Sequence, residues 1–248
     1  MSAWSLPVWM WLRYCWPLRF SGDQRESPAF AMVLLGLAVA LLFDRGYGPP
    51  VYLTIYNLFL LLLYLFHMSA VKHPSLPPVN GIFPGLSCVG GIDWNATAAA
   101  GQRGMEGVLL LFLRGTFCAD SLRQVATLGA LRSSLEKNGA MVVLASTESE
   151  VHWQKLQAEG LPVEIIQLAA GAKENMAFVA AQAMPVWLRL AATIVPRFRY
   201  LADSTAVCRP SAWLLDKDGY VLWRQPAANY RQPAEMSMLR SQLFRLGE

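Results

Sequence analysis

The chain has 248 residues, of which 54% are hydrophobic and only 15% are charged, and its net charge is +4. Soluble globular chains carry about 25% charged residues, so this composition argues against a wholly soluble protein and excludes a disordered one. The small positive charge is too mild to indicate a nucleic-acid partner. Four cysteines in 248 residues do not make a disulfide scaffold, and none of them forms a Cys-x-x-Cys pair, so no zinc knuckle and no dithiol motif is present. The sequence also has no metal-ligand spacing and no phosphate-binding loop, so we expect no metal site and no bound cofactor.

Residues 1–26 are expected to form an aromatic arm that lies in the membrane interface. Tryptophan and tyrosine prefer the headgroup level of a bilayer, where arginine side chains also reach water, so the arm is expected to contact membrane lipid. The alternative is an arm that packs against a partner subunit. The residues concerned are Trp4, Trp9, Trp11, Arg13, Tyr14, Trp16 and Arg19.

Two apolar stretches then predict a transmembrane helical hairpin over residues 27–72. Residues 27–43 contain no charge in 17 positions, and residues 46–71 contain none in 26. A membrane-spanning helix needs roughly 20 apolar residues, so we predict spans at about 28–43 and 51–71, joined by the glycine- and proline-containing segment 44–50. A signal peptide or a buried core hairpin is the alternative. The first run starts too far along the chain for a signal peptide, and the second lacks the polar face of a core helix.

The charges around the hairpin predict its orientation. Arg13, Arg19, Arg25 and Lys72 flank it on the side of the termini, whereas its loop carries only Arg45 beside an aspartate. Cytoplasmic loops carry the excess of basic residues, so we expect an integral protein of a bacterial-type inner membrane with its C-terminal domain in the cytoplasm.

Residues 73–104 begin with the proline-rich run PSLPPVN and are predicted to be a linker, and residues 105–248 are predicted to be one α/β domain. Continuous apolar runs predict buried strands, three- and four-residue spacing predicts helices, and Thr147 with Glu150 predicts a capping box for a helix to about residue 159. The resulting order is β-α-β-α-β, an apolar helical insert, and then β-β-α, which predicts a three-layer α/β/α domain. The strands are expected at 108–113, 141–145, 163–168, 211–215 and 220–223, and the first and last helices at 122–135 and 234–246.

The apolar insert at 175–196 has one charge, Arg189, in 22 residues. Its polar residues and Pro185 disfavour a third membrane span. We therefore expect a helix, broken at Pro185, that packs on the domain and contacts lipid or a partner subunit.

The residue most indicative of chemistry is Cys118, which follows the first predicted strand and opens the first helix of the domain. A helix N-terminus stabilises a thiolate, and the thiolate is the form that attacks disulfides and peroxides. Ser121 stands one turn later, where its hydroxyl could donate a hydrogen bond to the thiolate. Asp120 works in the opposite direction, because a nearby carboxylate disfavours the thiolate.

The stretch VLLLFLRGTFCADSLRQV at 108–125 resembles the first strand and active-site helix of the thioredoxin-like superfamily. It is most similar to the peroxiredoxin-like branch (alkyl hydroperoxide reductase/thiol-specific antioxidant, or redoxin). Phe117 and Cys118 match the family's aromatic–Cys pair, whereas Ser121 replaces its second cysteine. A second motif, RPSAWLLDKDGYVLWR at 209–224, is similar to the family's later strand pair. The resemblance covers roughly residues 105–246 and implies a thioredoxin-like fold, a reactive Cys118 and a cis-proline at Pro210 that faces it.

The chain departs from this family at positions that matter for its chemistry. Peroxiredoxins carry threonine three residues before the reactive cysteine, where this chain has Gly115, and a proline that this chain lacks. Without a second cysteine at residue 121, what remains is monothiol chemistry supported by an outside thiol donor. Cys208 is a candidate resolving thiol or an ordinary buried cysteine. Arg209 is a candidate to polarise a peroxide oxygen or a partner in a surface salt bridge.

The remaining reactive side chains have no motif around them. Cys15 and Cys88 are interpreted as structural, and His152 as a solvated residue of a surface helix. Two functions therefore stay open. The first is a membrane-anchored thiol oxidoreductase or thiol peroxidase that acts through Cys118, with Ser121, Arg209 and Pro210 around it. The second is a redox-inactive thioredoxin-like accessory or assembly subunit of a membrane complex, bound through the arm, the hairpin or the insert.

Overall fold

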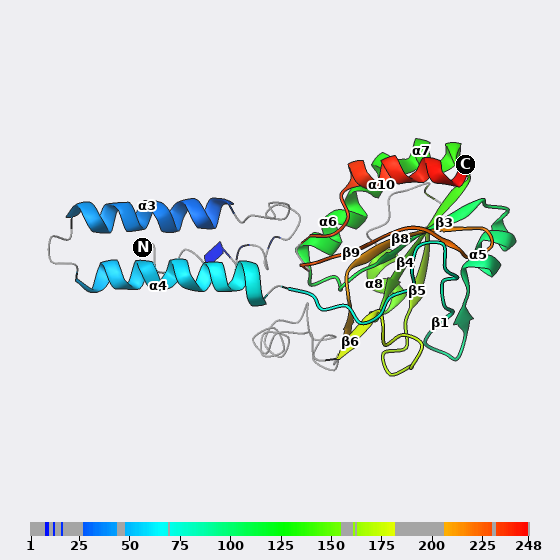
Figure 1. Cartoon of the computed structure of the whole chain (residues 1–248), viewed down its shortest axis with the longest axis horizontal. Coiled ribbons are helices and arrows are strands. Elements are labelled where there is room, and N and C mark those ends of the chain that lie inside the picture. The colour runs from blue at the N-terminus through cyan, green and yellow to red at the C-terminus, as the bar shows by residue number, and fades with distance from the viewer. Residues whose placement is uncertain are drawn as a thin grey trace.

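The computed structural model describes residues 8–9, 12, 16, 27–43, 48–68, 70–154, 161, 163–181, 206–229 and 232–247. Within these ranges it contains a pair of apolar helices and an α/β domain, and the helix pair projects from one side of that domain (Figure 1). Nearly all of the predicted aromatic arm, including Cys15, and residues 182–196 of the predicted insert lie outside the described residues.

The helix pair consists of α3, Ser27–Phe43, and α4, Pro49–Leu63, which continues as the π-helical turn η2, Tyr64–Met68. Prolines at the start of α4 suit a helix N-terminus, where their missing N–H groups leave no hydrogen bond unmade. Ala29 and Val33 of α3 pack against Leu61 and Leu65. The first predicted segment is therefore helical, and the second is helical as far as Met68. Among the described helices, Pro49–His67 is long and apolar enough to cross a membrane, whereas α3 is a shorter apolar helix of 17 residues.

The segment 73–104, which the sequence assigned to a linker, is largely structured. It contains the short antiparallel strands β1, Leu86–Ser87, and β2, Asp93–Trp94, and the helix α5, Ala96–Arg103. Asn95 caps α5 by accepting a hydrogen bond from the Thr97 N–H at 2.9 Å. Side chains from this segment enter the core of the domain, so the linker is shorter than predicted; they include Phe83, Leu86, Trp94 and Ala100.

The domain is built on a five-stranded sheet with the order β5-β4-β3-β8-β9. The strands β3, β4 and β5 are parallel, whereas β8 and β9 run antiparallel to their neighbours. Every residue of β3 and β4 is buried, which explains why both strands read as uninterrupted apolar runs. The bounds are Gly107–Phe112 for β3, Ala140–Ser146 for β4, Val163–Gln167 for β5, Ser211–Asp216 for β8 and Val221–Pro226 for β9.

Helices cover one face of this sheet (Figure 1). The predicted helix at 122–135 is divided into α6, Ala119–Thr127, the 3-10 turn η3, Leu128–Leu131, and α7, Arg132–Lys137. The C-terminal helix α10, Met236–Gln242, with its 3-10 extension η5, Leu243–Gly247, packs beside them. The short helix α8, Glu150–Gln154, buries Trp153 in the same cluster.

The opposite face is covered by α5, by the β1–β2 pair and by a second antiparallel pair, β6, Val179–Ala181, with β7, Ala206–Cys208. Its centre is a group of aromatic side chains, in which the Phe112 and Phe178 rings stack with centroids 4.6 Å apart. The domain is therefore three-layered, as predicted, although short strands supply much of one outer layer. Its strand order and directions are those of a mixed α/β, thioredoxin-like fold.

Two local predictions are wrong. The Thr147 hydroxyl donates to the Ala206 carbonyl at 3.0 Å and ties β4 to β7, and α8 begins only at Glu150, so Thr147 is not the helix cap. The described residues contain no cis peptide bond, so Pro210 is trans. The trans form is the lower-energy one even before proline. The Pro210 carbonyl accepts from the Ala227 N–H at 3.0 Å.

Candidate functional site

Cys118 lies where strand β3 gives way to helix α6. It is the N-cap residue of α6, and its carbonyl accepts the first helical hydrogen bond from the Leu122 N–H at 3.0 Å. The Cys118 N–H donates to the Gly115 carbonyl at 3.0 Å, so the chain turns tightly before the helix. The thiol makes no capping hydrogen bond, and the residue is 6% exposed. The predicted position of Cys118 between the strand and the helix is confirmed.

Ser121 lies one turn further along α6, but its hydroxyl is used by the backbone. The Ser121 Oγ accepts a hydrogen bond from the Arg114 N–H at 3.2 Å. Within the described residues, no hydrogen bond joins Ser121 to the Cys118 thiol. The Arg114 guanidinium carbon lies 5.3 Å from the centroid of the Phe117 ring, which is within cation–π range. Ser121 and Arg114 therefore fix the two ends of the segment that carries Cys118.

A buried carboxyl group, Glu148, lies directly against this segment. Its Oε2 accepts a hydrogen bond from the Thr116 N–H at 2.8 Å, and the Thr116 side chain bonds to the same carboxyl group. Gly115 has φ +152°, and a Cβ on it would lie only 2.6 Å from Glu148 Oε1 and would also collide with the Phe117 ring. Only glycine fits this position, because both its backbone conformation and the close approach of Glu148 exclude a side chain.

Burial changes the acidity of two groups at this site. It raises the pKa of Glu148 from its ordinary value of 4.5 to about 7, against the opposing effect of the Thr116 hydrogen bonds. Burial also raises the pKa of the Cys208 thiol to about 12, and the nearby Glu148 charge acts in the same direction. Cys208 therefore remains a thiol at neutral pH. Glu148 therefore interacts both with Cys208, through its charge, and with the segment that carries Cys118, through Thr116.

Cys208 and its neighbours on the second motif lie in the layer formed by β6 and β7. Cys208 pairs with Val179 in that short sheet and belongs to the core, and it takes part in no disulfide. The Arg209 guanidinium, through Nη1, donates to the carbonyls of Met176, Ala177 and Val179 at 2.8, 3.2 and 2.7 Å. The contacts that the structure gives Arg209 therefore hold the loop before β6. Pro210 is buried at the start of β8.

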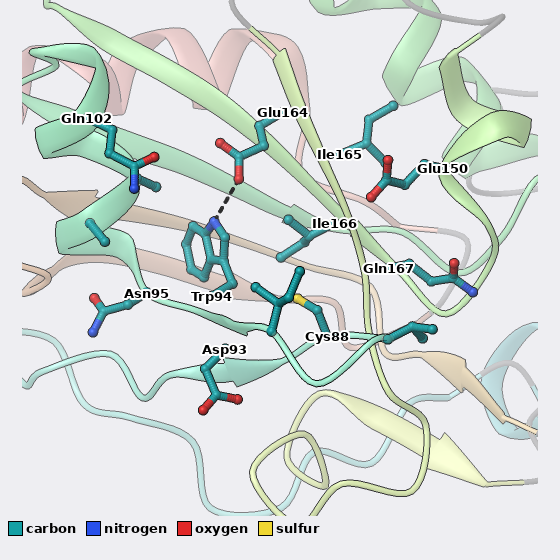
Figure 2. A pocket seen from close by; sticks show the side chains of 14 residues that line it. Cys88, Asp93, Trp94, Asn95, Gln102, Glu150, Glu164, Ile165, Ile166 and Gln167 are labelled. Carbon is teal, nitrogen blue, oxygen red and sulfur yellow. Dashed lines mark hydrogen bonds between the residues drawn. The ribbon is translucent and has the colours of Figure 1, made fainter.

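Among the described residues, the structure forms two cavities that Cys118 does not line. One, of about 460 Å³, lies between α6 and residues 233–237, where Gln124 Nε2 donates to the Ala234 carbonyl at 3.3 Å. The other, of about 340 Å³, is enclosed by the β1–β2 pair, α5 and β5 (Figure 2). There the Trp94 indole N–H donates to Glu164 Oε1 at 3.2 Å, and Cys88 is half-buried beside it. Burial raises the pKa of the Cys88 thiol.

No group of three or more histidine, cysteine, aspartate or glutamate side chains in the described part of the chain is placed to hold a metal ion. Around Cys118, the structure gathers Ser121 from the predicted site and adds two residues to which the sequence analysis gave no role, Arg114 and Glu148. The sequence contains a pattern that could have pointed to Glu148, because Glu148 follows strand β4 just as Cys118 follows strand β3. The carboxyl ends of adjacent parallel strands meet at one edge of a sheet.

No family model matches this chain, and no curated protein matches it. Solved structures with a similar fold are peroxiredoxins. A cysteine-to-serine mutant of peroxiredoxin 6 of Arenicola marina has 9% identity and a TM-score of 0.46, with 70% of this chain and 72% of that chain covered. The peroxidoxin BcpB from Mycobacterium tuberculosis has 12% identity and a TM-score of 0.45, with 71% and 97% covered. Reduced Prx3 of Vibrio vulnificus in complex with hydrogen peroxide has 14% identity and a TM-score of 0.44, with 70% and 96% covered. Identities and scores of this size carry no information on activity.

Proposed function

We propose that this protein is a membrane-anchored thiol oxidoreductase of the peroxiredoxin-like type, in which Cys118 alone reacts with a peroxide. The observation that carries the proposal is the position of Cys118 as N-cap of α6, at the carboxyl end of a central buried strand. The free N–H groups and the positive dipole end of a helix N-terminus favour a thiolate there. The thiolate is the nucleophile that this chemistry requires.

In the proposed step, the Cys118 thiolate sulfur forms a bond to the distal oxygen of a hydroperoxide while the O–O bond breaks. The electron pair of that bond leaves with the alkoxide, which takes a proton from solvent, so the peroxide is reduced by two electrons and the sulfur is oxidised to a sulfenic acid. An outside thiol then condenses with the sulfenic acid, releasing water and forming a mixed disulfide. A second outside thiol exchanges with that disulfide and restores Cys118.

A thiol donor from outside the chain is part of the proposal because no internal cysteine is suited to the resolving role. Residue 121 is a serine whose hydroxyl accepts from Arg114. Cys208 is held in the core by the β6–β7 pairing, and its pKa of about 12 leaves almost no thiolate at neutral pH. Small thiols that reach the start of α6 are the donors expected to act.

The membrane anchor is supported by the apolar side chains that α3 and α4 leave uncovered. Phe43 and Leu42 at the end of α3 are 82% and 76% exposed, and Tyr52 and Tyr56 on α4 and Phe66 on η2 are exposed as well. A water-soluble domain rarely leaves so much contiguous apolar surface exposed, whereas lipid chains would cover it. We propose that the pair inserts as a hairpin, with the α/β domain on the cytoplasmic side.

The proposal is tested with the full chain purified in detergent or reconstituted in lipid, supplied with hydrogen peroxide and dithiothreitol. Peroxide consumption is expected in the wild type, together with a sulfenic acid at Cys118 that dimedone traps. Cys118→Ser should lose both signals, whereas the matched control Cys88→Ser should keep them. Equal consumption by the wild type and Cys118→Ser would overturn the proposal.

A second candidate function is a redox-inactive accessory or assembly subunit of a membrane complex. It is favoured by the 6% exposure of Cys118, together with the serine at residue 121. The uncovered face of α3 and α4 would then meet other membrane subunits rather than lipid alone. Gentle purification from native membranes distinguishes the two: a stoichiometric membrane partner without peroxide turnover indicates the subunit, and turnover by the chain alone indicates the enzyme.

A further inference from the structure

We propose that Glu148 is a positioning residue for Cys118: its ionised carboxylate holds residues 115–118 in place, and uptake of one proton releases them and makes Cys118 react faster. The inference rests on the proposed function only in taking Cys118 as the reactive thiol. It assigns a role to a side chain that the reaction described above does not use.

The first argument is the placement of the carboxyl group. Glu148 is 6% exposed and lies at the carboxyl end of β4, next to the end of β3. Its Oε2 accepts the Thr116 N–H at 2.8 Å, and its Oε1 lies 2.6 Å from the place that a Cβ on Gly115 would occupy. The carboxyl group is therefore directed at the backbone of the two residues that precede Phe117 and Cys118.

The second argument is that one oxygen of this group is left unpaired. Among the described residues, Glu148 Oε1 is buried without a hydrogen-bond partner. A buried oxygen without a partner is unfavourable, and more so when it shares a negative charge. Proton uptake removes that charge, which agrees with a pKa raised to about 7. The two states of Glu148 are thus both populated near neutral pH.

The two states hold the segment with different strength. A hydrogen bond to an ionised carboxylate is roughly twice as strong as one to a neutral acceptor. Ionised Glu148 therefore binds the Thr116 N–H more tightly than protonated Glu148 does, and it holds the segment that carries Cys118 in place. Protonation of Glu148 weakens this hydrogen bond, so the segment that carries Cys118 is released more readily.

Two ionisable groups near Glu148, Cys208 and Arg209, do not replace it in this role. Burial keeps the Cys208 thiol protonated at neutral pH, since its pKa is about 12. The Arg209 guanidinium donates to the 176–179 carbonyls. The remaining ionisable groups lie on the same segments or on the helices that follow them, and they are Arg114, Asp120, Glu150 and His152.

The test measures how fast iodoacetamide, a neutral reagent, modifies Cys118 in the full chain between about pH 5 and 9, read from the Cys118 peptide by mass spectrometry. In the wild type we expect the titration of the thiol and a second protonation step near pH 7. Glu148→Gln should lose the second step and should react about fivefold faster at pH 8, the size expected when one charge-assisted hydrogen bond becomes a neutral one. Glu148→Asp keeps an ionisable group and should retain a second step.

The matched control is Glu150→Gln, which removes an exposed carboxylate two residues away and should leave the wild-type profile unchanged. The inference is overturned if Glu148→Gln follows the wild-type profile, if Glu150→Gln gives the same change, or if Glu148→Asp loses the second step. If Glu148→Gln does not fold, the Asp variant decides alone. If the chain shows no peroxide turnover but the modification-rate profiles are as expected, the proposed function is wrong and this inference stands. If the chain turns over peroxide but the Glu148→Gln and wild-type profiles superimpose, this inference is wrong and the proposed function stands.

Discussion

Replacing Glu148 by glutamine should stabilise the domain at alkaline pH and not at acid pH. Burial raises the pKa of Glu148 from 4.5 to about 7. At about 1.4 kcal/mol for each pH unit, ionising this group in the folded state opposes folding by about 3 kcal/mol. Glutamine keeps the size of the side chain and an oxygen for the Thr116 N–H, but it carries no charge.

The direction of this pH effect on stability depends on whether the folded or the unfolded chain keeps the Glu148 proton at a given pH. Between pH 4.5 and about 7 the folded protein keeps the Glu148 proton while the unfolded chain has lost it. The stability associated with this group is therefore complete below pH 4.5 and is lost as the pH rises through about 7. The Gln variant should exceed the wild type by up to about 3 kcal/mol at pH 8 and should match it, or fall slightly below it, at pH 4.

Urea unfolding of the full chain in detergent at the two pH values measures this difference, with the fluorescence of the fully buried Trp153 and Trp213 reporting the core. Glu150→Gln, an exposed neighbour, should shift stability by less than about 0.5 kcal/mol at either pH. A Glu148→Gln effect of equal size at pH 4 and pH 8 would refute the reasoning, because it would show that shape rather than charge is responsible.

Three further substitutions probe the contacts around the site, each by urea unfolding. Gly115→Ala should destabilise the domain by about 1–3 kcal/mol, because residue 115 has φ +152° and the new Cβ would lie 2.6 Å from Glu148 Oε1. The control Gly171→Ala, at a residue with open space around it, should change the free energy of unfolding by less than about 0.5 kcal/mol. Asn175→Ala should lower the free energy of unfolding by about 2–3 kcal/mol, because the buried amide accepts from the Ser87 N–H and donates to the Ser87 and Ala169 carbonyls. A decrease below about 1 kcal/mol would contradict this expectation. Arg209→Ala should lower the free energy of unfolding by about 1–2 kcal/mol and should speed amide hydrogen exchange in residues 176–179, whose carbonyls the guanidinium binds. Unchanged hydrogen exchange there would argue against these contacts.

The central strands and the position of Cys118 could be predicted from the sequence because they depend on local patterns. A strand that is buried on both faces must be apolar at every position, and 108–113 and 141–145 are. A cysteine between such a strand and an amphipathic helix must lie at the helix N-terminus. The strand pair 211–215 and 220–223 followed in the same way from its intervening turn, in which Gly219 has φ +83°.

The elements in 73–104 could not be predicted, because strands of two residues leave no periodicity and α5 is rich in alanine rather than patterned. The contacts of Arg209 could not be predicted for a different reason. Its guanidinium binds backbone carbonyls 30 to 33 residues earlier in the chain, and carbonyls carry no sequence signal. The role of Glu148 at the site could not be predicted either, because Thr147 and Glu150 were interpreted as a capping box. That interpretation placed Glu148 in the first turn of a helix.

The register of the sheet explains why Glu148 and the segment before Cys118 meet. Strands β3 and β4 pair in parallel with Phe112 opposite Ala145, and the Leu113 N–H donates to the Ala145 carbonyl at 2.8 Å. Thr116 stands four residues beyond Phe112 and Glu148 three beyond Ala145, so the two chains leave the sheet together and remain within hydrogen-bonding distance. The two fully buried strands therefore bring Glu148 and the segment before Cys118 to the same edge of the sheet. A change in the charge of Glu148 is therefore expected to act first on its hydrogen bond to the Thr116 N–H, two residues before Cys118.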